Sequence, residues 1–347
     1  MYKLSDRQAQ DIVDKMMQDI PYNINIMNEQ GIIIGSGNAR RIGTVHQGAV
    51  AALQTGTMVE VWQDGRLEKK GTNEPIVING QRIGVIGISG DPDEVRPFCN
   101  LVRTTVTLLI EQRSRLESLA HEANRKKAFL EQLLRYTGSA YPPRMRREAT
   151  EYGLDLLLCT TVLLVRRLRL DEHTARLLLQ FPSFQQTSEQ DDMQLIFVQH
   201  EAELPSLLDT LRHRQPQAQL TIGRSEFLIA HSYAQAHDTM NVLLALQPDT
   251  SFATYDQLQF IIQFGQSVTT SHNPVVKLEE HADLLQTLRS FIFHNGSIHD
   301  TALVLNIHRN TLQYRLKRIQ AITGRDPRQW LELIELTHGL LAMYFAP

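Results

Sequence analysis

Cysteine is scarce in this sequence. Only Cys99 and Cys159 occur in 347 residues, far apart and without metal-ligand spacing. We therefore expect neither a disulfide framework nor a zinc site, and a reducing cytoplasm fits this usage. A chain of this length fits two or three domains, and a hydrophobic share of 42% is enough for packed cores.

Long hydrophobic runs are also missing. The opening residues, "MYKLSDRQAQDIVDKMM", are polar and periodic and contain no apolar signal core. The longest apolar stretch, "LDLLLCTTVLLV", is too short and too interrupted to span a bilayer. We expect a soluble cytoplasmic protein without a membrane partner.

The residue patterns of common enzyme classes are not found either. His294, His299 and His308 lack metal-ligand spacing to any cysteine or acidic cluster. The run "GQRIGVIGISG" contains glycines but is not followed by a helix opening, which argues against a dinucleotide site. No set of serine, histidine and aspartate is indicated by the sequence alone. We therefore predict no catalytic residue, no metal and no cofactor.

The first part of the chain mixes helix and strand patterns. Apolar residues recur at helical spacing over residues 4–20, up to Pro21. Two β-rich runs follow in "NINIMNEQGIIIGSG", then a helix in "VHQGAVAALQTG" and a strand in "MVEVW". "EPIVINGQRIGVIGISG" predicts a hairpin that turns at Asn79 and Gly80. Together these patterns predict a small α+β module.

One long helix is predicted from Pro92 to about Tyr136. Its heptad positions a would be Leu109, Leu116, Ala123 and Leu130, and its positions d Gln112, Leu119, Lys126 and Leu133. This seam predicts a homodimer or a higher oligomer, with the polar positions setting the register. The alternative is a helix that packs on its own domain.

Strand and helix patterns alternate in the middle of the chain. Strands are predicted in "LLLCTTVLLVRR", "MQLIFVQ", "AQLTIGRS" and "SFATY", and helices in "EAELPSLLDTLRHR" and "FLIAHSYAQAHDTMNVLLAL". These patterns predict a domain built from strands and helices in alternation. The polar run "SVTTSHNP", residues 267–274, interrupts them and is expected to be a linker.

Acidic residues are absent from residue 308 to residue 325, although the whole chain has a formal charge of −3. This basic stretch is the last of three predicted helices, over residues 284–293, 298–305 and about 308–324. Ser297 is a good N-cap for the second helix, and Asn306 tolerates the left-handed backbone that a tight turn needs. Two short helices joined in this way, the second of them basic, predict a helix-turn-helix.

The third helix has an apolar face and a polar face. Leu312, Leu316 and Ile319 recur at helical spacing and are predicted to face the core. The polar side chains suit the base edges and phosphates of duplex DNA. The predicted DNA contacts are His308, Arg309, Asn310, Thr311, Gln313, Tyr314, Arg315, Lys317 and Arg318. The alternative is a solvated basic helix, but such a helix usually carries interleaved acids.

Two parts of the chain resemble known families. "NGSIHDTALVLNIHRNTLQYRLKRIQAITGRDP" resembles the C-terminal helix-turn-helix of purine-catabolism-regulator-type transcription factors. "NINIMNEQGIIIGSGNARRIGTVHQGA" and "GTNEPIVINGQRIGVIGISGDPDEV" resemble the sugar-diacid recognition domain of carbohydrate diacid regulators. The resemblance covers nearly the whole chain. It implies an effector-responsive transcriptional regulator, usually an activator, which senses a small hydroxylated carboxylate such as galactarate, glucarate or glycerate and binds a double-stranded DNA operator.

The resemblance also implies an α+β multidomain fold. Residues 1–136 would form an N-terminal α+β sensor domain with a long signalling helix, residues 137–268 a central degenerate GGDEF-like α/β domain, and residues 277–345 an all-α helix-turn-helix domain. The glycines of the cyclase are absent from "TSEQDDMQLIFV", where Asp191 and Asp192 remain as acids. We therefore predict that the chain is not an enzyme. The alternative is a nucleotidyl cyclase or a hydroxy-acid-processing enzyme with an accessory DNA-binding tail.

A hydroxylated carboxylate needs cationic side chains, free backbone N–H groups and small polar side chains around it. "GSGNARRIGTVHQGA" supplies all of these, with Thr44 as the predicted cap of a helix whose N-terminus forms an anion site. The predicted effector contacts are Ser36, Gly37, Asn38, Arg40, Arg41, Gly43, Val45, His46, Gln47 and Gly48. Arg40 is preferred over Arg41 for the carboxylate. The alternative is a surface loop whose arginine pair is solvated.

Overall fold

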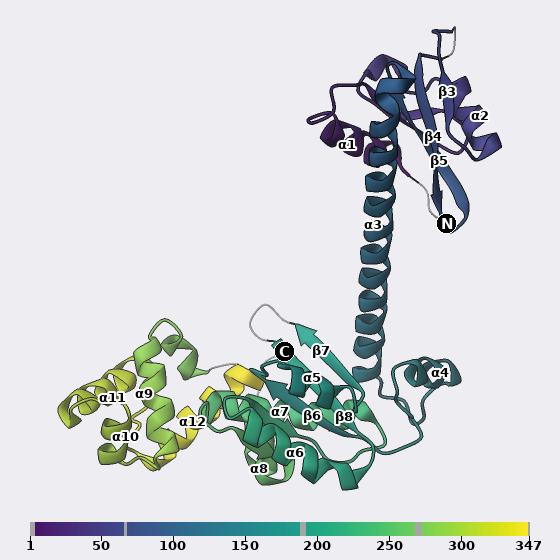
Figure 1. The fold of residues 1–347 in the computed structure, drawn as a ribbon. Helices are drawn as coiled ribbons and strands as arrows, with labels where there is room; N and C mark the ends of the chain where they lie inside the picture. The colour runs from purple at the N-terminus through teal and green to yellow at the C-terminus, as the bar shows by residue number, and fades with distance from the viewer. Residues whose placement is uncertain (1–3, 66–67, 188–191, 268–272, 346–347) are drawn as a thin grey trace. The chain divides into compact units, whose positions relative to one another are not determined.

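The computed structural model describes residues 4–65, 68–187, 192–267 and 273–345 of the chain (Figure 1). The chain divides into two compact units, with the division between Arg125 and Lys126. Two five-stranded sheets are present, and the C-terminal region is helical. The predicted α+β multidomain fold class is therefore confirmed.

The sheet of the first unit has the strand order β2-β1-β5-β4-β3, and its neighbouring strands are antiparallel. Its strands are β1 (Ile24–Met27), β2 (Ile33–Ser36), β3 (Val59–Val61), β4 (Gly71–Ile78) and β5 (Gln81–Ser89). The predicted hairpin is confirmed, because β4 and β5 are joined by Asn79 and Gly80 with φ of 49° and 77°. These residue types tolerate that left-handed backbone.

Helices pack on both faces of this sheet. They are α1 (Asp6–Met16), α2 (Gln47–Thr55) and α3 (Pro92–Leu134). Successive side chains of a strand point to opposite faces. Ile26 of β1 accordingly packs with residues of α1 and α3, whereas Met27 packs with Ala49 and Ala52 of α2.

The first helix is shorter than the sequence predicted. Its spacing indicated a helix that continues to Pro21, but the regular helix ends at Met16. Residues 17–19 form a turn, in which the N–H groups of Gln18 and Asp19 reach carbonyls three residues earlier rather than four. The apolar Ile20 is buried after this turn, which explains why its position looked helical.

The sheet of the second unit has the strand order β10-β9-β6-β8-β7; β9 and β10 pair in parallel, and the other neighbours are antiparallel. Its strands are β6 (Thr161–Arg166), β7 (Ser183–Thr187), β8 (Asp192–Val198), β9 (Gln219–Ile222) and β10 (Phe252–Thr254). The edge strand β7 was not predicted from the sequence, because "SFQQT" has only one large apolar residue. Asp191 lies outside the described residues, and Asp192 is exposed at the start of β8.

The C-terminal helices share a core with the end of α7. The helices of the second unit are α4 (Pro143–Glu151), α5 (Glu172–Leu178), α6 (Leu204–Arg214), α7 (Ile229–Leu246), α8 (Tyr255–Gln266), α9 (Ala282–Phe293), α10 (Ile298–Val304), α11 (Arg309–Thr323) and α12 (Trp330–Phe345). Leu246 of α7 belongs to one apolar cluster with Leu284 of α9, Leu316 of α11 and Leu340 of α12. The DNA-binding candidate is therefore packed on the domain before it.

The predicted linker is ordered at its C-terminal end. Residues 268–272 lie outside the described part, but Asn273 caps the short 3-10 helix Pro274–Leu278 and donates from Nδ2 to the Gly339 carbonyl at 2.7 Å. Val275 in this helix is fully buried. The side chain of Asn273 and the buried Val275 therefore attach this end of the predicted linker to α12. The linker itself stays a prediction.

Helix α3 confirms the predicted long helix but not the whole predicted seam. Leu130 and Leu133 are 4% and 0% exposed, in the core of the second unit. Side chains buried in this core cannot also meet a second copy, so the C-terminal end of the seam is wrong as a dimer contact. Leu109, Leu116 and Leu119 are 43%, 60% and 54% exposed and remain available.

Candidate DNA-binding helix and candidate effector site

The helix-turn-helix consists of α10 and α11. Ser297 caps α10, since its Oγ accepts a hydrogen bond from the Asp300 N–H at 3.3 Å. Asn306 makes the turn at a φ of 52°. Helix α11 has His308 as its N-cap and ends before Gly324, which has a φ of 74°. The predicted helices and their local signals are confirmed.

The two faces of α11 are those that its spacing predicted. Leu312, Leu316 and Ile319 are fully buried against the neighbouring helices. Apart from Arg315, all the predicted DNA contacts are exposed. Within the described ranges, Arg309 and Lys317 form no ion pair. Their charge is therefore available to an anionic partner.

Arg315 lies differently from the other basic residues of α11. Its guanidinium donates from one Nη to Thr287 Oγ1 at 3.2 Å, and its Nε lies 3.7 Å from Asp283 Oδ2. Both partners belong to α9. Arg315 therefore holds the recognition helix on α9, and it is the least available of the predicted DNA contacts.

A row of buried polar side chains crosses the sheet of the first unit. Ser36, Asn25 and Asn73 lie on β2, β1 and β4, in register with Gly87 of β5. Each of the three side chains is at most 3% exposed. Ser36 Oγ donates to Asn25 Oδ1 at 2.7 Å. Buried polar groups are costly unless they are paired, so their concentration here marks a candidate binding surface.

Helix α2 begins over this row, but not at the predicted place. Thr44 Oγ1 donates to the carbonyl three residues earlier at 2.6 Å, and the N-cap of α2 is His46. The prediction of Thr44 as the cap is therefore wrong. The His46 N–H donates to the Gly31 carbonyl at 3.0 Å, which removes it from the predicted anion site. Gln47 and Gly48 supply the first amides of the helix, and neither has a partner among the described residues.

Glycine at position 48 allows the start of α2 to approach the polar row closely. A Cβ atom on Gly48 would lie 2.6 Å from Asn73 Nδ2 and 3.2 Å from His46 Cε1. A side chain at this position would therefore have to displace the asparagine. The first turn of α2, Asn73 and the His46 ring thus form one local site.

His46 is a buried histidine with one unpaired nitrogen. Its side chain is 4% exposed, and its Nε2 accepts a hydrogen bond from the Lys69 N–H at 3.4 Å. Burial, and then the positive charge of Arg41, lower the pKa of His46 to about 4, so the ring is neutral at neutral pH. Because a neutral imidazole carries one hydrogen and Nε2 accepts, we assign the hydrogen to Nδ1. Nδ1 is buried without a hydrogen-bond partner in the described part of the chain.

The two arginines of the predicted site lie in different surroundings. Arg40 is exposed, whereas Arg41 is half-buried and donates from Nη1 to Ser89 Oγ on β5 at 3.4 Å. Burial lowers the pKa of Arg41, against the raising effect of Asp64. Among the described residues no carboxylate lies within ion-pair distance of Arg41, and Asp64 pairs with Lys69 at 2.9 Å. The geometry therefore favours Arg41, against the preference for Arg40 drawn from the sequence.

The remaining predicted effector contacts are either already hydrogen-bonded or exposed at the surface. The Ser36 hydroxyl is occupied by Asn25, and Asn38 Oδ1 accepts from the Arg40 N–H at 3.2 Å. The exposed members are Gly37, Asn38, Arg40, Gly43, Val45 and Gln47. Sequence reasoning missed Asn25, Asn73 and Ser89. Their signal was the polar residues that interrupt the apolar strands in "NINIM", "GTNEPIV" and "GVIGIS".

Metal-binding clusters and membrane-spanning helices are both absent from the described part of the chain. No group of three or more histidine, cysteine, aspartate or glutamate side chains could hold a metal ion there. No helix within these same residues is long and apolar enough to cross a membrane.

Comparison with known proteins identifies a family at each end of the chain. Residues 4–133 match the family described as "Putative sugar diacid recognition", and residues 284–342 match the "PucR C-terminal helix-turn-helix domain". The first match contains the polar row and Arg41, and the second contains α10 and α11. Both resemblances predicted from the residues are confirmed.

Relatives align along nearly the whole chain. An uncharacterized protein of Haemophilus influenzae is 28% identical over 93% of this chain and 94% of its own. The carbohydrate diacid regulator of Escherichia coli is 29% identical over 94% of each chain. The uncharacterized protein YsfB of Bacillus subtilis is 24% identical over 97% of this chain and 96% of its own. These matches and the DNA-binding family indicate a transcriptional regulator and not an enzyme.

Proposed function

We propose that the chain is a member of the carbohydrate diacid regulator family, and that it activates genes for the use of a sugar diacid, galactarate or glucarate, or of the related acid glycerate. Binding of the acid to the first unit would control DNA binding by α11. The observation that carries this proposal is the half-buried Arg41, which has no ion-pair partner among the described residues, beside the unpartnered Nδ1 of His46.

The effector carboxylate would be held at the start of α2. Arg41 supplies a cationic fork, and Gln47 and Gly48 supply backbone N–H groups at the positive end of a nine-residue helix. His46 Nδ1–H adds a neutral donor. The hydroxyl groups of the acid would meet Asn73 and the other polar side chains of the row. A neutral sugar would leave the guanidinium unpaired, so an acid is preferred over its alcohol.

The DNA operator would be read by the exposed face of α11. Arg309 and Asn310 occupy its first turn, the part of a recognition helix that contacts base edges. Lys317 and Arg318 lie further along and would contact phosphates. One helix-turn-helix reads one half-site, so a symmetric operator requires two copies of the chain.

The domain division is part of this proposal. Residues 1–136 would recognise the acid, residues 137–268 would form a degenerate cyclase-like domain without catalytic activity, and residues 277–345 would bind DNA. A regulator with a DNA operator as its partner would work in the cytoplasm.

Thermal unfolding of the full-length protein with galactarate, glucarate, glycerate and their neutral alcohol analogues tests the effector site. A ligand that binds the folded state alone stabilises it, by about 2.7 kcal/mol at a concentration one hundred times its dissociation constant. We expect at least one acid to raise the melting temperature of the wild type, and the neutral analogues to have little effect.

Arg41→Ala and Arg40→Ala form a matched pair for this test. Arg41→Ala should lose the acid-induced shift, whereas Arg40→Ala should keep it, because the Arg40 side chain is exposed. The far-ultraviolet circular dichroism of both variants should match that of the wild type. An equal response of the two variants to the acid would refute the assignment of Arg41.

A further inference from the structure

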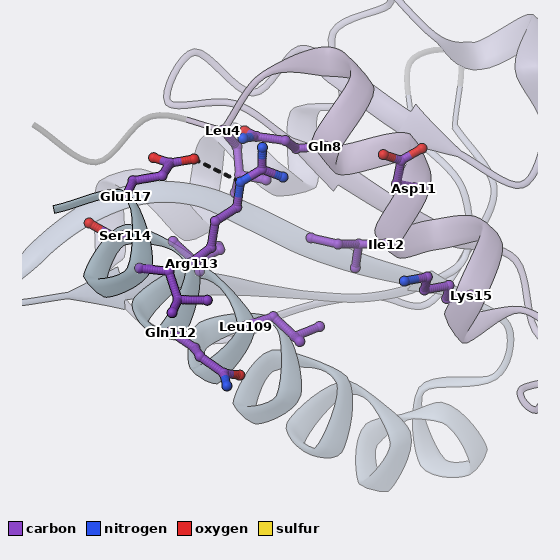
Figure 2. Close-up of a pocket in the computed structure, with 12 residues that line it drawn as sticks. Leu4, Gln8, Asp11, Ile12, Lys15, Leu109, Gln112, Arg113, Ser114 and Glu117 are labelled. Carbon is purple, nitrogen blue, oxygen red and sulfur yellow. Dashed lines mark hydrogen bonds and ion pairs between the residues drawn. The ribbon is translucent and has the colours of Figure 1, made fainter. Parts of the chain in front are cut away.

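A groove separates α1 from α3 in the first unit (Figure 2). It has a volume of about 440 Å³. These two helices pack on the sheet face opposite to α2, so the groove and the candidate effector site belong to different sides of the sheet. Leu4 and Ile12 form one apolar wall, and Leu109, Ile110 and Leu116 form the other.

The charges around the groove do not suit a dianionic ligand. Asp11 and Lys15 stand on α1, and Arg113 and Glu117 stand on α3, so the acids and bases balance (Figure 2). Arg113 is already paired, with its Nε 2.9 Å from Glu117 Oε1. Arg41, by contrast, has no ion-pair partner among the described residues. The groove therefore fits an apolar helix face better than a small acid.

We propose that this groove is the site at which a second copy of the chain docks, with the exposed leucines of α3 from each copy entering the groove of the other. Leu109 and Leu116 are seven residues apart, as are Gln112 and Leu119, which is the spacing of a helix that packs along another helix. Leu109, Leu116 and Leu119 are 43%, 60% and 54% exposed, and this contact would remove them from water.

The charges identify a copy of this chain as the occupant. A two-fold interface brings the same surface of both copies together, and a rim with both signs of charge can then pair with itself. A partner with charges of one sign only could not pair with both the acids and the bases of the rim.

The contact is limited to one part of α3. The heptad positions after Leu119 include Leu130 and Leu133, which are buried in the second unit, so the contact is confined to the stretch beside the groove.

Sedimentation velocity of the full-length protein over a range of concentrations tests this interface. We expect a wild-type dimer. Leu116→Glu should raise its dissociation constant by about tenfold or more, because dimerisation would bury an unpaired carboxylate. Leu101→Glu is the matched control, since Leu101 lies on the same helix outside the groove and is 62% exposed, compared with 60% for Leu116.

A second variant tests the other wall of the groove. Lys15→Glu reverses a charge on α1 and should also weaken the dimer, by severalfold, without touching the leucines. A wild type that remains monomeric at about 50 µM would overturn the proposal. So would a dimer that tolerates Leu116→Glu and Lys15→Glu as well as it tolerates Leu101→Glu.

Discussion

Helices α2 and α11 both start at a histidine N-cap, yet these two histidines are used in opposite ways. His308 is exposed, and its Nδ1 accepts a hydrogen bond from the Asn310 N–H of its own helix at 3.2 Å. His46 is buried, makes no side-chain cap bond, and leaves Nδ1 without a partner in the described structure. One histidine completes its helix, and in our proposal the other binds the effector.

The surroundings of each helix explain this difference. Helix α11 presents exposed cations to solvent, a surface that suits the long polyanionic backbone of DNA. Helix α2 begins over buried Asn73 beside one half-buried guanidinium, which suits a small anion with hydroxyl groups. The same residue type at the same helix position therefore predicts neither role until burial and hydrogen bonding are known.

The largest expected effect is the pH dependence that buried His46 gives to stability. Its pKa is about 4 in the folded protein, compared with an ordinary value of 6.5. The unfolded chain therefore takes up the proton first, and the stability present above pH 6.5 is lost as the pH falls toward 4, by up to about 3 kcal/mol. Urea unfolding of the wild type and His46→Phe at several pH values in this window would measure the loss. If the free energies of unfolding of the two proteins changed in parallel with pH, the lowered pKa of His46 would be contradicted.

Substitutions in the first turn of α11 should have the next largest effect. Arg309→Ala and Asn310→Ala should each weaken operator binding by about 1–3 kcal/mol and relax sequence preference, if they contact bases. Lys317→Ala should weaken binding to all sequences alike and reduce the salt dependence, as expected for a phosphate contact. Gel-shift titrations at two salt concentrations distinguish these outcomes. Unchanged operator affinity in all three variants would remove α11 as the DNA-binding helix.

The smallest expected effect concerns the cap at His308. His308→Ala should destabilise the second unit by about 1 kcal/mol, because the Asn310 N–H loses its acceptor. His308→Asn is the control, since asparagine is a good N-cap and should restore most of the loss. Thermal unfolding without ligand measures both. Equal melting temperatures for the alanine and asparagine variants would show that the cap bond contributes little.

The helix-turn-helix could be predicted from the sequence because its signals are local. Ser297, Asn306 and Gly324 each act on residues within one turn, so their residue types were sufficient. The apolar positions of α11 follow from helical spacing alone. Neither feature depends on contacts that are distant in the sequence.

The effector site could be predicted only in part, because its geometry depends on distant residues. Thr44 looked like a helix cap. The His46 N–H instead donates to the Gly31 carbonyl, and the helix begins only after His46. Arg41 is distinguished from Arg40 by its contact with Ser89, 48 residues later in the sequence. No local pattern records such a contact. The family matches confirm a recognition domain but do not assign these residues.

Operator binding with and without the acid tests whether an acid bound at Arg41 controls DNA binding by α11. The wild type, Arg41→Ala and Arg40→Ala would be titrated onto a DNA duplex selected by the wild type, in the presence and absence of galactarate or glucarate. We expect an acid to change the operator affinity of the wild type and of Arg40→Ala, while Arg41→Ala still binds DNA but no longer responds. An Arg41→Ala protein whose operator affinity responds to the acid as the wild type does would contradict this expectation.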